Sequence, residues 1–203
     1  MSAARGTATH TVRRRLTQRQ QARRERILAA ASALATSGGY EAVVMKDVAA
    51  RARVSLGTLY RYFASKDHLL AETLLAWGSE LGRRLRESPP RAAEVSERVA
   101  SVFRRMARGV EQEPQLGIAL TRALLSNDPS AFANREGLEA MMRDWIVQAL
   151  GDAEVGDREG VVAVLRHVCF SCMIMLVNGQ RSPHEVGEEL ARCTRLLLAR
   201  GRR

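Results

Sequence analysis

The sequence lacks the motifs that most enzymes, secreted proteins and membrane proteins carry. It has no phosphate-binding glycine loop, dinucleotide fingerprint, nucleophile elbow or HExxH motif. Its four histidines, at positions 10, 68, 167 and 184, have no metal-ligand spacing. No apolar run approaches the ~18 residues of a membrane helix, and residues 1–12 lack the apolar core of an export signal. We therefore expect a soluble cytoplasmic protein, not an enzyme, with no cofactor, metal or membrane partner.

Cysteine is scarce, with three residues in 203. Cys169 and Cys172 form a C-x-x-C pair, but they lie in the middle of an apolar segment and no second pair accompanies them. Redox motifs of this spacing begin exposed helices, often near a βαβ unit. We favour a buried core position for both thiols, and the redox motif is the alternative.

Positive charge is concentrated in the first third of the chain. Residues 1–70 contain 13 Lys and Arg against 4 Asp and Glu, whereas residues 71–203 contain 19 against 18. A confined basic excess is typical of phosphate binding, and a solubilising tail is the alternative. We predict that residues 1–15 form a flexible basic arm, which either enters a minor groove or only adds nonspecific attraction.

Apolar residues recur at three- and four-residue steps along most of the chain, and no strand-like alternation is present. This pattern predicts an all-α fold of about nine helices. Two of them are short and lie between residues 44 and 63. We expect the other seven at residues 17–37, 65–87, 94–112, 114–124, 129–150, 157–178 and 182–200. Gly38 and Gly39 should end the first helix, and Ser65 and Ser182 should cap later ones.

The two short helices organise the chain. Val48, Ala49 and Ala52 share one face of the first, and Leu59 and Phe63 share the inner face of the second. Two short helices joined by a turn of about three to four residues match a helix-turn-helix, whose second helix enters the major groove of DNA.

The outward residues of the second helix suit DNA. Ser55 should cap the helix, and Gly57 should let the backbone approach a duplex closely. Leu56 and Tyr60 offer apolar surface to thymine methyl groups. Arg61 either reads a guanine or holds a phosphate.

The segments GGY at 38–40, VAARA at 48–52 and VSLGTLYRYF at 54–63, followed by Ser65 and Lys66, resemble the DNA-binding domain of the TetR family of bacterial ligand-released repressors. The resemblance covers roughly residues 22–72. Within the family these runs are most similar to repressors of steroid catabolism. The family resemblance implies a DNA-binding domain at residues 16–64, after the arm, and a ligand-binding and dimerisation domain at residues 65–203.

The same resemblance assigns phosphate contacts to Lys46, Thr58, Tyr62 and Lys66, although Tyr62 has rim packing as its alternative. The sequence departs from the family pattern twice. A Val occupies position 44, where the family commonly has a capping Thr, which forfeits ~1 kcal/mol. Arg53 occupies a turn position that is commonly Gly, so it should adopt a positive φ at a cost of ~1 kcal/mol, which a phosphate contact would offset.

The segment at 157–178 is apolar nearly all round, so its own domain can cover only one side. A second copy of the chain would cover the other. In the TetR family the last two helices form a four-helix dimer interface, and the resemblance implies a homodimer here. The interface residues we predict are Val164, Leu165, Val168, Cys172, Leu176, Val186, Leu190, Cys193 and Leu197.

A ligand pocket is also implied by the family, and plain core packing is the alternative for each of its residues. The candidates are Trp77, Phe103, Met106, Leu120, Met141, Met142, Trp145 and Met173. The function we predict is a homodimeric regulator that binds double-stranded operator DNA and is released by a small apolar or acyl-CoA effector, in steroid or lipid catabolism. The alternatives are an architectural DNA-binding protein without an effector, and an enzyme that uses the C-terminal cavity.

Overall fold

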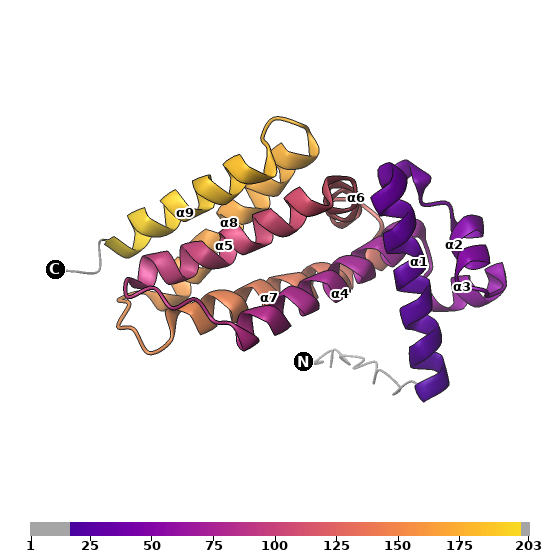
Figure 1. Ribbon diagram of the computed structural model, residues 1–203, viewed down its shortest axis with the longest axis horizontal. Coiled ribbons are helices and arrows are strands. Elements are labelled where there is room, and N and C mark those ends of the chain that lie inside the picture. The colour runs from indigo at the N-terminus through magenta and orange to yellow at the C-terminus, as the bar shows by residue number, and fades with distance from the viewer. Residues whose placement is uncertain (1–16, 200–203) are drawn as a thin grey trace, which may run out of the picture.

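The computed structural model describes residues 17–199, and within them the chain is built of helices and loops (Figure 1). The nine α-helices of this part are α1 (Gln18–Ala42), α2 (Met45–Arg51), α3 (Leu56–Tyr62), α4 (Lys66–Glu87), α5 (Val95–Gln112), α6 (Pro114–Leu124), α7 (Phe132–Leu150), α8 (Arg158–Val177) and α9 (Pro183–Ala199). A 3-10 turn, η1 (Pro129–Ala131), precedes α7. The prediction of an all-α fold is confirmed. The predicted basic arm, residues 1–15, lies outside the described residues.

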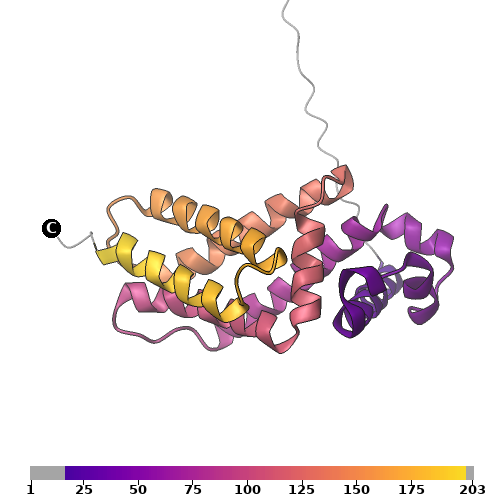
Figure 2. The same cartoon turned by 90° about the horizontal axis from the view of Figure 1, so that it is seen from above.

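The helices form two parts that share α4. Helices α1, α2 and α3 lie at one end of the elongated molecule, and α4 runs from them into the bundle of α5, α7, α8 and α9 (Figure 1). Helix α6 crosses where the parts meet and contacts both α1 and α4 (Figure 2). In the bundle, α5 packs most extensively on α9. This arrangement makes α4 and α6 the connections between the two parts.

Side-chain caps begin the helices where the sequence predicted them. The hydroxyls of Ser55 and Ser65 accept the backbone N–H three residues on, at 3.2 Å and 3.0 Å. Ser182 and Glu185 form a capping box, with hydrogen bonds of 3.2 Å and 2.8 Å. Val44 has no polar side chain, so α2 begins without a side-chain cap. These contacts fix the starts of α3, α4 and α9.

The regular part of helix α1 ends at its glycine pair, as predicted, and a further helical turn follows the break. Gly39 has the expected positive φ of 69°, but the chain then makes another helical turn that reaches Ala42. The amide of Val43 closes this turn on the carbonyl of Tyr40 at 3.2 Å. The glycine break therefore kinks α1 and turns Tyr40 toward α4.

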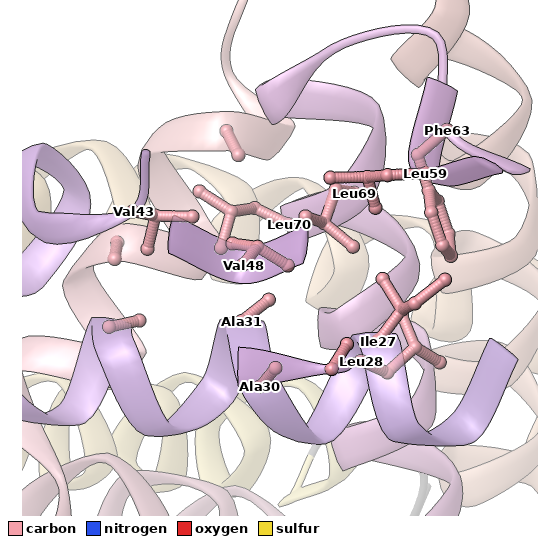
Figure 3. Packing of buried hydrophobic residues seen from close by; sticks show 14 of the residues in the cluster. Ile27, Leu28, Ala30, Ala31, Val43, Val48, Leu59, Phe63, Leu69 and Leu70 are labelled. Atoms are coloured by element: carbon pink, nitrogen blue, oxygen red, sulfur yellow. The ribbon is translucent and has the colours of Figure 1, made fainter. Parts of the chain in front are cut away.

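The first apolar cluster joins α1, α2, α3 and the start of α4. Leu59 and Phe63 are 0% and 1% exposed, as predicted, and pack near Ile27 and Val48 (Figure 3). Burying each such side chain contributes about 1.5–3 kcal/mol. The cluster extends into the bundle through Leu69, Leu70, Leu116, Ala119, Leu120 and Ala123. The core beneath α2 and α3 thus continues into α4 and α6.

The second cluster fills the bundle and contains the C-x-x-C pair. Cys169 and Cys172 are 1% and 3% exposed. Burial raises the pKa of Cys169 to about 12 and the pKa of Cys172 to about 11, so both thiols are protonated at neutral pH. The predicted core position of this pair is confirmed.

Helix α8 is more apolar than the sequence analysis allowed. Among the described helices, it alone is long and apolar enough to cross a membrane, which corrects the expectation that no run approached that length. Only 28% of its most apolar window is buried within the chain. Val164, Phe170 and Ile174 are 43%, 48% and 39% exposed on it. An unaccompanied helix of this kind is weak evidence for a membrane span, since a core helix of a soluble protein has the same composition.

Candidate DNA-binding face and ligand cavity

The turn between α2 and α3 holds the two helices at a fixed angle. The amide of Val54 donates to the carbonyl of Ala49 at 3.0 Å, and the amide of Arg53 donates to Ala50 at 3.1 Å. These two bonds are those of a Schellman helix end, with Arg53 in its left-handed position. Its φ is 55°, as predicted, and among the described non-glycine residues it alone has a positive φ. The side chain of Arg53 is exposed.

Seven of the ten predicted DNA-binding residues are exposed on the α2–α3 unit. They are Lys46, Arg53, Ser55, Leu56, Gly57, Tyr60 and Arg61. Leu56 and Tyr60 are among the few large apolar side chains left in solvent, at 42% and 50% exposure. Apart from its chain neighbours and the nearby backbone of α3, no described atom lies within 4 Å of the position that a Cβ of Gly57 would take, so the backbone of α3 is open there. Arg51, at the end of α2, is a further exposed cation that the sequence analysis did not select.

The other three predicted residues are only partly exposed. The hydroxyl of Thr58 accepts a hydrogen bond from Ser55 at 2.9 Å. The ring of Tyr62 packs against Phe63, with 6.3 Å between ring centroids, which is the rim packing weighed as its alternative. Lys66 lies at the first turn of α4, where its ammonium group has a partner within the protein.

That partner is Tyr40, which lies where the two parts of the molecule meet. The Lys66 ammonium is 3.8 Å from the centroid of the Tyr40 ring, and the Arg122 guanidinium is 4.2 Å from it. The Tyr40 hydroxyl donates to the Asp67 carboxylate at 2.5 Å. Burial, with help from Asp67, raises the pKa of Tyr40 to about 12, and burial lowers the pKa of Lys66. Sequence reasoning missed this junction.

Helix α6 contributes to the junction and to a cavity at the same time. Arg122 also pairs with Glu41 at the end of α1 at 2.9 Å. Ser126, just after α6, donates to the second carboxylate oxygen of Asp67 at 2.5 Å. The opposite side of α6 lines the cavity through Leu120, Thr121 and Leu124. Helix α6 and Ser126 just after it therefore contact α1, α4 and the cavity at once.

The inner cavity has a volume of about 60 Å³ and an almost wholly apolar wall. Six of the eight predicted ligand residues line it: Trp77, Met106, Leu120, Met142, Trp145 and Met173. Phe103 and Met141 do not line it. Phe103 is 2% exposed inside the bundle core, and Met141 packs against α4 at Gly78. A helical apolar pattern marks burial but does not say which buried face meets a cavity.

A second, outer chamber of about 300 Å³ adjoins the inner cavity. The two share a wall formed by Thr121, Leu124, Leu138, Met142, Cys169 and Met173. The outer chamber is also lined by Arg135, Arg166 and His167, which the sequence analysis did not select. The sequence pattern did not bring these residues together, because Arg135 lies on α7 whereas Arg166 and His167 lie on α8.

The predicted dimer residues divide into two groups. Leu165, Cys172, Leu176, Val186 and Leu190 are 3% exposed or less within the single chain, where they pack on the chain's own bundle. Val168, Cys193 and Leu197 are partly exposed, and Val164 is exposed. The large apolar side chains that α8 and α9 leave in solvent are Val164, Phe170, Ile174 and Leu196.

Comparison with known proteins matches both parts of the chain. The profile described as "Bacterial regulatory proteins, tetR family" matches residues 27–73, and "Tetracyclin repressor-like, C-terminal domain" matches residues 93–197. The HTH-type transcriptional repressor KstR of Rhodococcus jostii is 37% identical over 185 residues, which cover 91% of this chain and 86% of that protein.

Solved structures have the same fold. A TetR transcriptional regulator from Rhodococcus sp. RHA1 superimposes with a TM-score of 0.78 at 27% identity, covering 89% of this chain and 98% of that one. FadR of Thermus thermophilus, solved in complex with lauroyl-CoA, gives a TM-score of 0.61 at 26% identity over 86% and 93%. The relatives are named transcriptional repressors and regulators, not enzymes. The chain belongs to the TetR family of bacterial DNA-binding transcriptional regulators.

Proposed function

We propose that this regulator is a cytoplasmic homodimer that represses transcription from a near-palindromic operator and is released by an apolar effector bound in its C-terminal cavity. The observation that carries the proposal is the two-sided position of α6. One side of α6 lines the cavity and the other holds Tyr40 and Asp67, at the ends of the helices that support α3.

On DNA, α3 enters the major groove, and residues 16–64 act as the reading module. Leu56 and Tyr60 contact thymine methyl groups, and Arg61 contacts a guanine or a phosphate. Lys46, Arg53 and Arg51 neutralise phosphates, while the capped start of α3 at Ser55 presents backbone N–H groups. The exposure of these groups on one helix-turn-helix supports these roles.

The effector acts because it binds more tightly to one arrangement of the dimer than to the arrangement that binds DNA. An effector that pushes on Leu120 and Leu124 moves α6 and, through Arg122 and Ser126, moves the start of α4. This changes the separation of the two α3 helices in the dimer, which must match the half-site spacing. By linkage, DNA weakens effector binding by the same factor.

Helices α8 and α9, within residues 65–203, form the dimer contact. The exposed apolar side chains Val164, Ile174 and Leu196, with the partly exposed Val168 and Leu197, are the surface that a second copy covers. Isologous association of two such helix pairs removes this apolar surface from water. The large exposed fraction of α8 supports this assignment.

The effector class we propose is a lipid or its acyl-CoA thioester. An outer chamber of about 300 Å³ with an apolar inner extension falls in the range of small-molecule sites. The related FadR of Thermus thermophilus was solved with lauroyl-CoA, which supports an acyl ligand. Similarity to KstR supports control of steroid or lipid catabolism genes.

The test begins with selection of DNA from a random pool by the purified protein. We expect a near-palindromic consensus, whereas fragments of no common sequence would support an architectural role. Tyr60→Ala should then relax sequence choice within each half-site. Arg53→Ala should weaken binding to every DNA sequence and lower the slope of log affinity against log salt concentration by about one. Arg108→Ala is the matched control, since Arg108 is exposed on α5 outside the DNA-binding unit. Equal losses of DNA affinity in all three variants would contradict the assigned DNA contacts.

A further inference from the structure

We propose that the outer chamber binds an anionic group of the effector, so that the effector is an amphiphile whose apolar end reaches into the inner cavity and whose carboxylate or phosphate is held by Arg166. This inference rests on the proposed function, because it assumes that the cavity is the effector site. It adds the charge of the effector and the residue that recognises it.

The two chambers differ in chemistry although they share a wall. The inner cavity is lined by apolar side chains with Thr121 as a minor exception. The outer chamber adds Arg135, Arg166 and His167, and Glu139 is the one carboxylate in its lining. A ligand that fills both must therefore be apolar at one end and compatible with positive charge at the other.

Arg166 has one hydrogen-bond donor that is not used. Its Nη2 pairs with Glu139, but its Nε is buried and no described residue accepts a hydrogen bond from it. Buried polar groups nearly always have partners, and leaving a charged donor unpaired is costly. An anion in the outer chamber would accept from this guanidinium, in the charge-assisted geometry that arginine provides for carboxylates and phosphates.

The other two basic groups are already engaged. Arg135 donates its Nε to the carbonyl of Leu124 at 2.9 Å and its Nη2 to that of Ser126 at 2.6 Å. Its guanidinium also lies 4.8 Å from the ring centroid of Phe132. The Nδ1 of His167 is 2.8 Å from the carbonyl of Ala163. Arg135 adds positive charge to the lining, whereas Arg166 supplies the hydrogen bond.

A competing location is the polar groove between α4 and α5, which contains Arg84, Arg105 and Arg108. It shares only Trp77 with the wall of the inner cavity. Arg84 pairs with Glu80 at 2.9 Å, and Arg105 donates to the carbonyl of Ser88 at 2.5 Å. The outer chamber shares six wall residues with the inner cavity, so its cations lie closer to the apolar cavity than those of this groove.

The experiment compares chain-matched ligands on the full-length protein. Dodecanoate, dodecyl phosphate and dodecan-1-ol are titrated below their aggregation concentrations and followed by intrinsic tryptophan fluorescence. Both tryptophans of the chain, Trp77 and Trp145, line the inner cavity, so the signal reports its occupancy. We expect at least one of the two anionic ligands to bind about tenfold or more tightly than the alcohol, which is the range of a hydrogen bond to a charged group. Their ratio then distinguishes a carboxylate from a phosphate preference.

Four variants make the result specific. Arg166→Gln should bring the three ligands within about threefold of one another, and Arg166→Lys should restore part of the preference. Glu139→Gln breaks the same ion pair but keeps the cation, so it should bind the anions at least as tightly as the wild type. Arg108→Gln should leave the preference unchanged.

Several outcomes would overturn the inference. Equal binding of all three ligands by the wild type would remove the anion site but leave the effector cavity in place. If Arg166→Gln and Glu139→Gln lost the same amount of affinity for the anionic ligands, Arg166 would have only a structural role. Loss of the preference in Arg108→Gln would move the anion to the groove between α4 and α5. If no ligand altered tryptophan fluorescence, the cavity itself, and with it the proposed function, would fail.

Discussion

Replacing Tyr40 by phenylalanine tests the junction between the DNA-binding helices and the cavity. The change removes only the hydroxyl that donates to Asp67 at 2.5 Å, and it keeps the ring between Lys66 and Arg122. Hydrogen bonds to charged groups contribute about 1.5–3 kcal/mol, and the partial exposure of Tyr40 favours the lower end. At roughly 2–4 °C per kcal/mol for a chain of this size, the melting temperature should fall by about 3–6 °C.

The same substitution has a pH signature. The pKa of Tyr40 is raised to about 12 in the folded protein from an ordinary value of 10.0, so folding favours the neutral phenol. The stabilisation is then complete below pH 10 and is lost as the pH rises from 10 to 12. Denaturant unfolding of the wild type and of Tyr40→Phe should therefore differ most at pH 8 and converge toward pH 12. Equal stabilities at pH 8, or a difference that stays constant across this window, would refute the reasoning.

The junction should also carry the effector signal. Asp67 joins Tyr40 of α1 to Ser126 after α6, so Tyr40→Phe and Ser126→Ala each remove one side of the connection. A double-mutant cycle should give a coupling energy of about 0.5 kcal/mol or more, since the two groups share one carboxylate. Both variants should still bind operator DNA but show a smaller loss of affinity when effector is added. Additive stability changes with an unaltered effector response would exclude this connection.

Three further predictions address separate parts of the molecule. Ile174→Glu places a charge on the exposed apolar face of α8 and should convert the dimer to a monomer in size-exclusion chromatography with light scattering; Glu188→Gln, on the exposed side of α9, is the control, and a dimeric Ile174→Glu would contradict the interface. Arg53→Gly keeps the positive φ of the turn, so the melting temperature should not fall while the salt slope of DNA binding drops by about one; an unchanged slope would remove Arg53 from the phosphate contacts. Gly109→Ala would bring a Cβ within 2.6 Å of the Trp77 indole, so it should shift tryptophan emission and weaken effector binding; unaltered emission and affinity would show that the indole is not held by this close approach.

The local structure was predictable from sequence because its causes are local. Ser55, Ser65 and Ser182 cap their helices through residues three positions on, and the inward spacing of Leu59 and Phe63 sets the face that α3 buries. The positive φ of Arg53 was expected from the family resemblance, since the matching turn position is commonly Gly.

What the sequence did not reveal depends on contacts between distant residues. Phe103 and Met106 have the same helical spacing, yet only Met106 reaches the cavity, because the packing of α5 on its neighbours decides which turn faces it. Leu165 and Val164 are adjacent in sequence, and only the position of the bundle makes Leu165 core and Val164 surface. Tyr40 meets Arg122 because the kink at Gly39 turns the end of α1.

The central claim is that occupancy of the cavity weakens operator binding. The direct measurement is fluorescence anisotropy of a labelled, selected operator, titrated with the protein at one fixed salt concentration, with and without saturating dodecanoate or lauroyl-CoA. Tryptophan fluorescence in the same samples reports whether the cavity is filled. We predict at least a fivefold loss of operator affinity, the lower end of typical allosteric coupling. An unchanged affinity with the cavity filled would contradict the account.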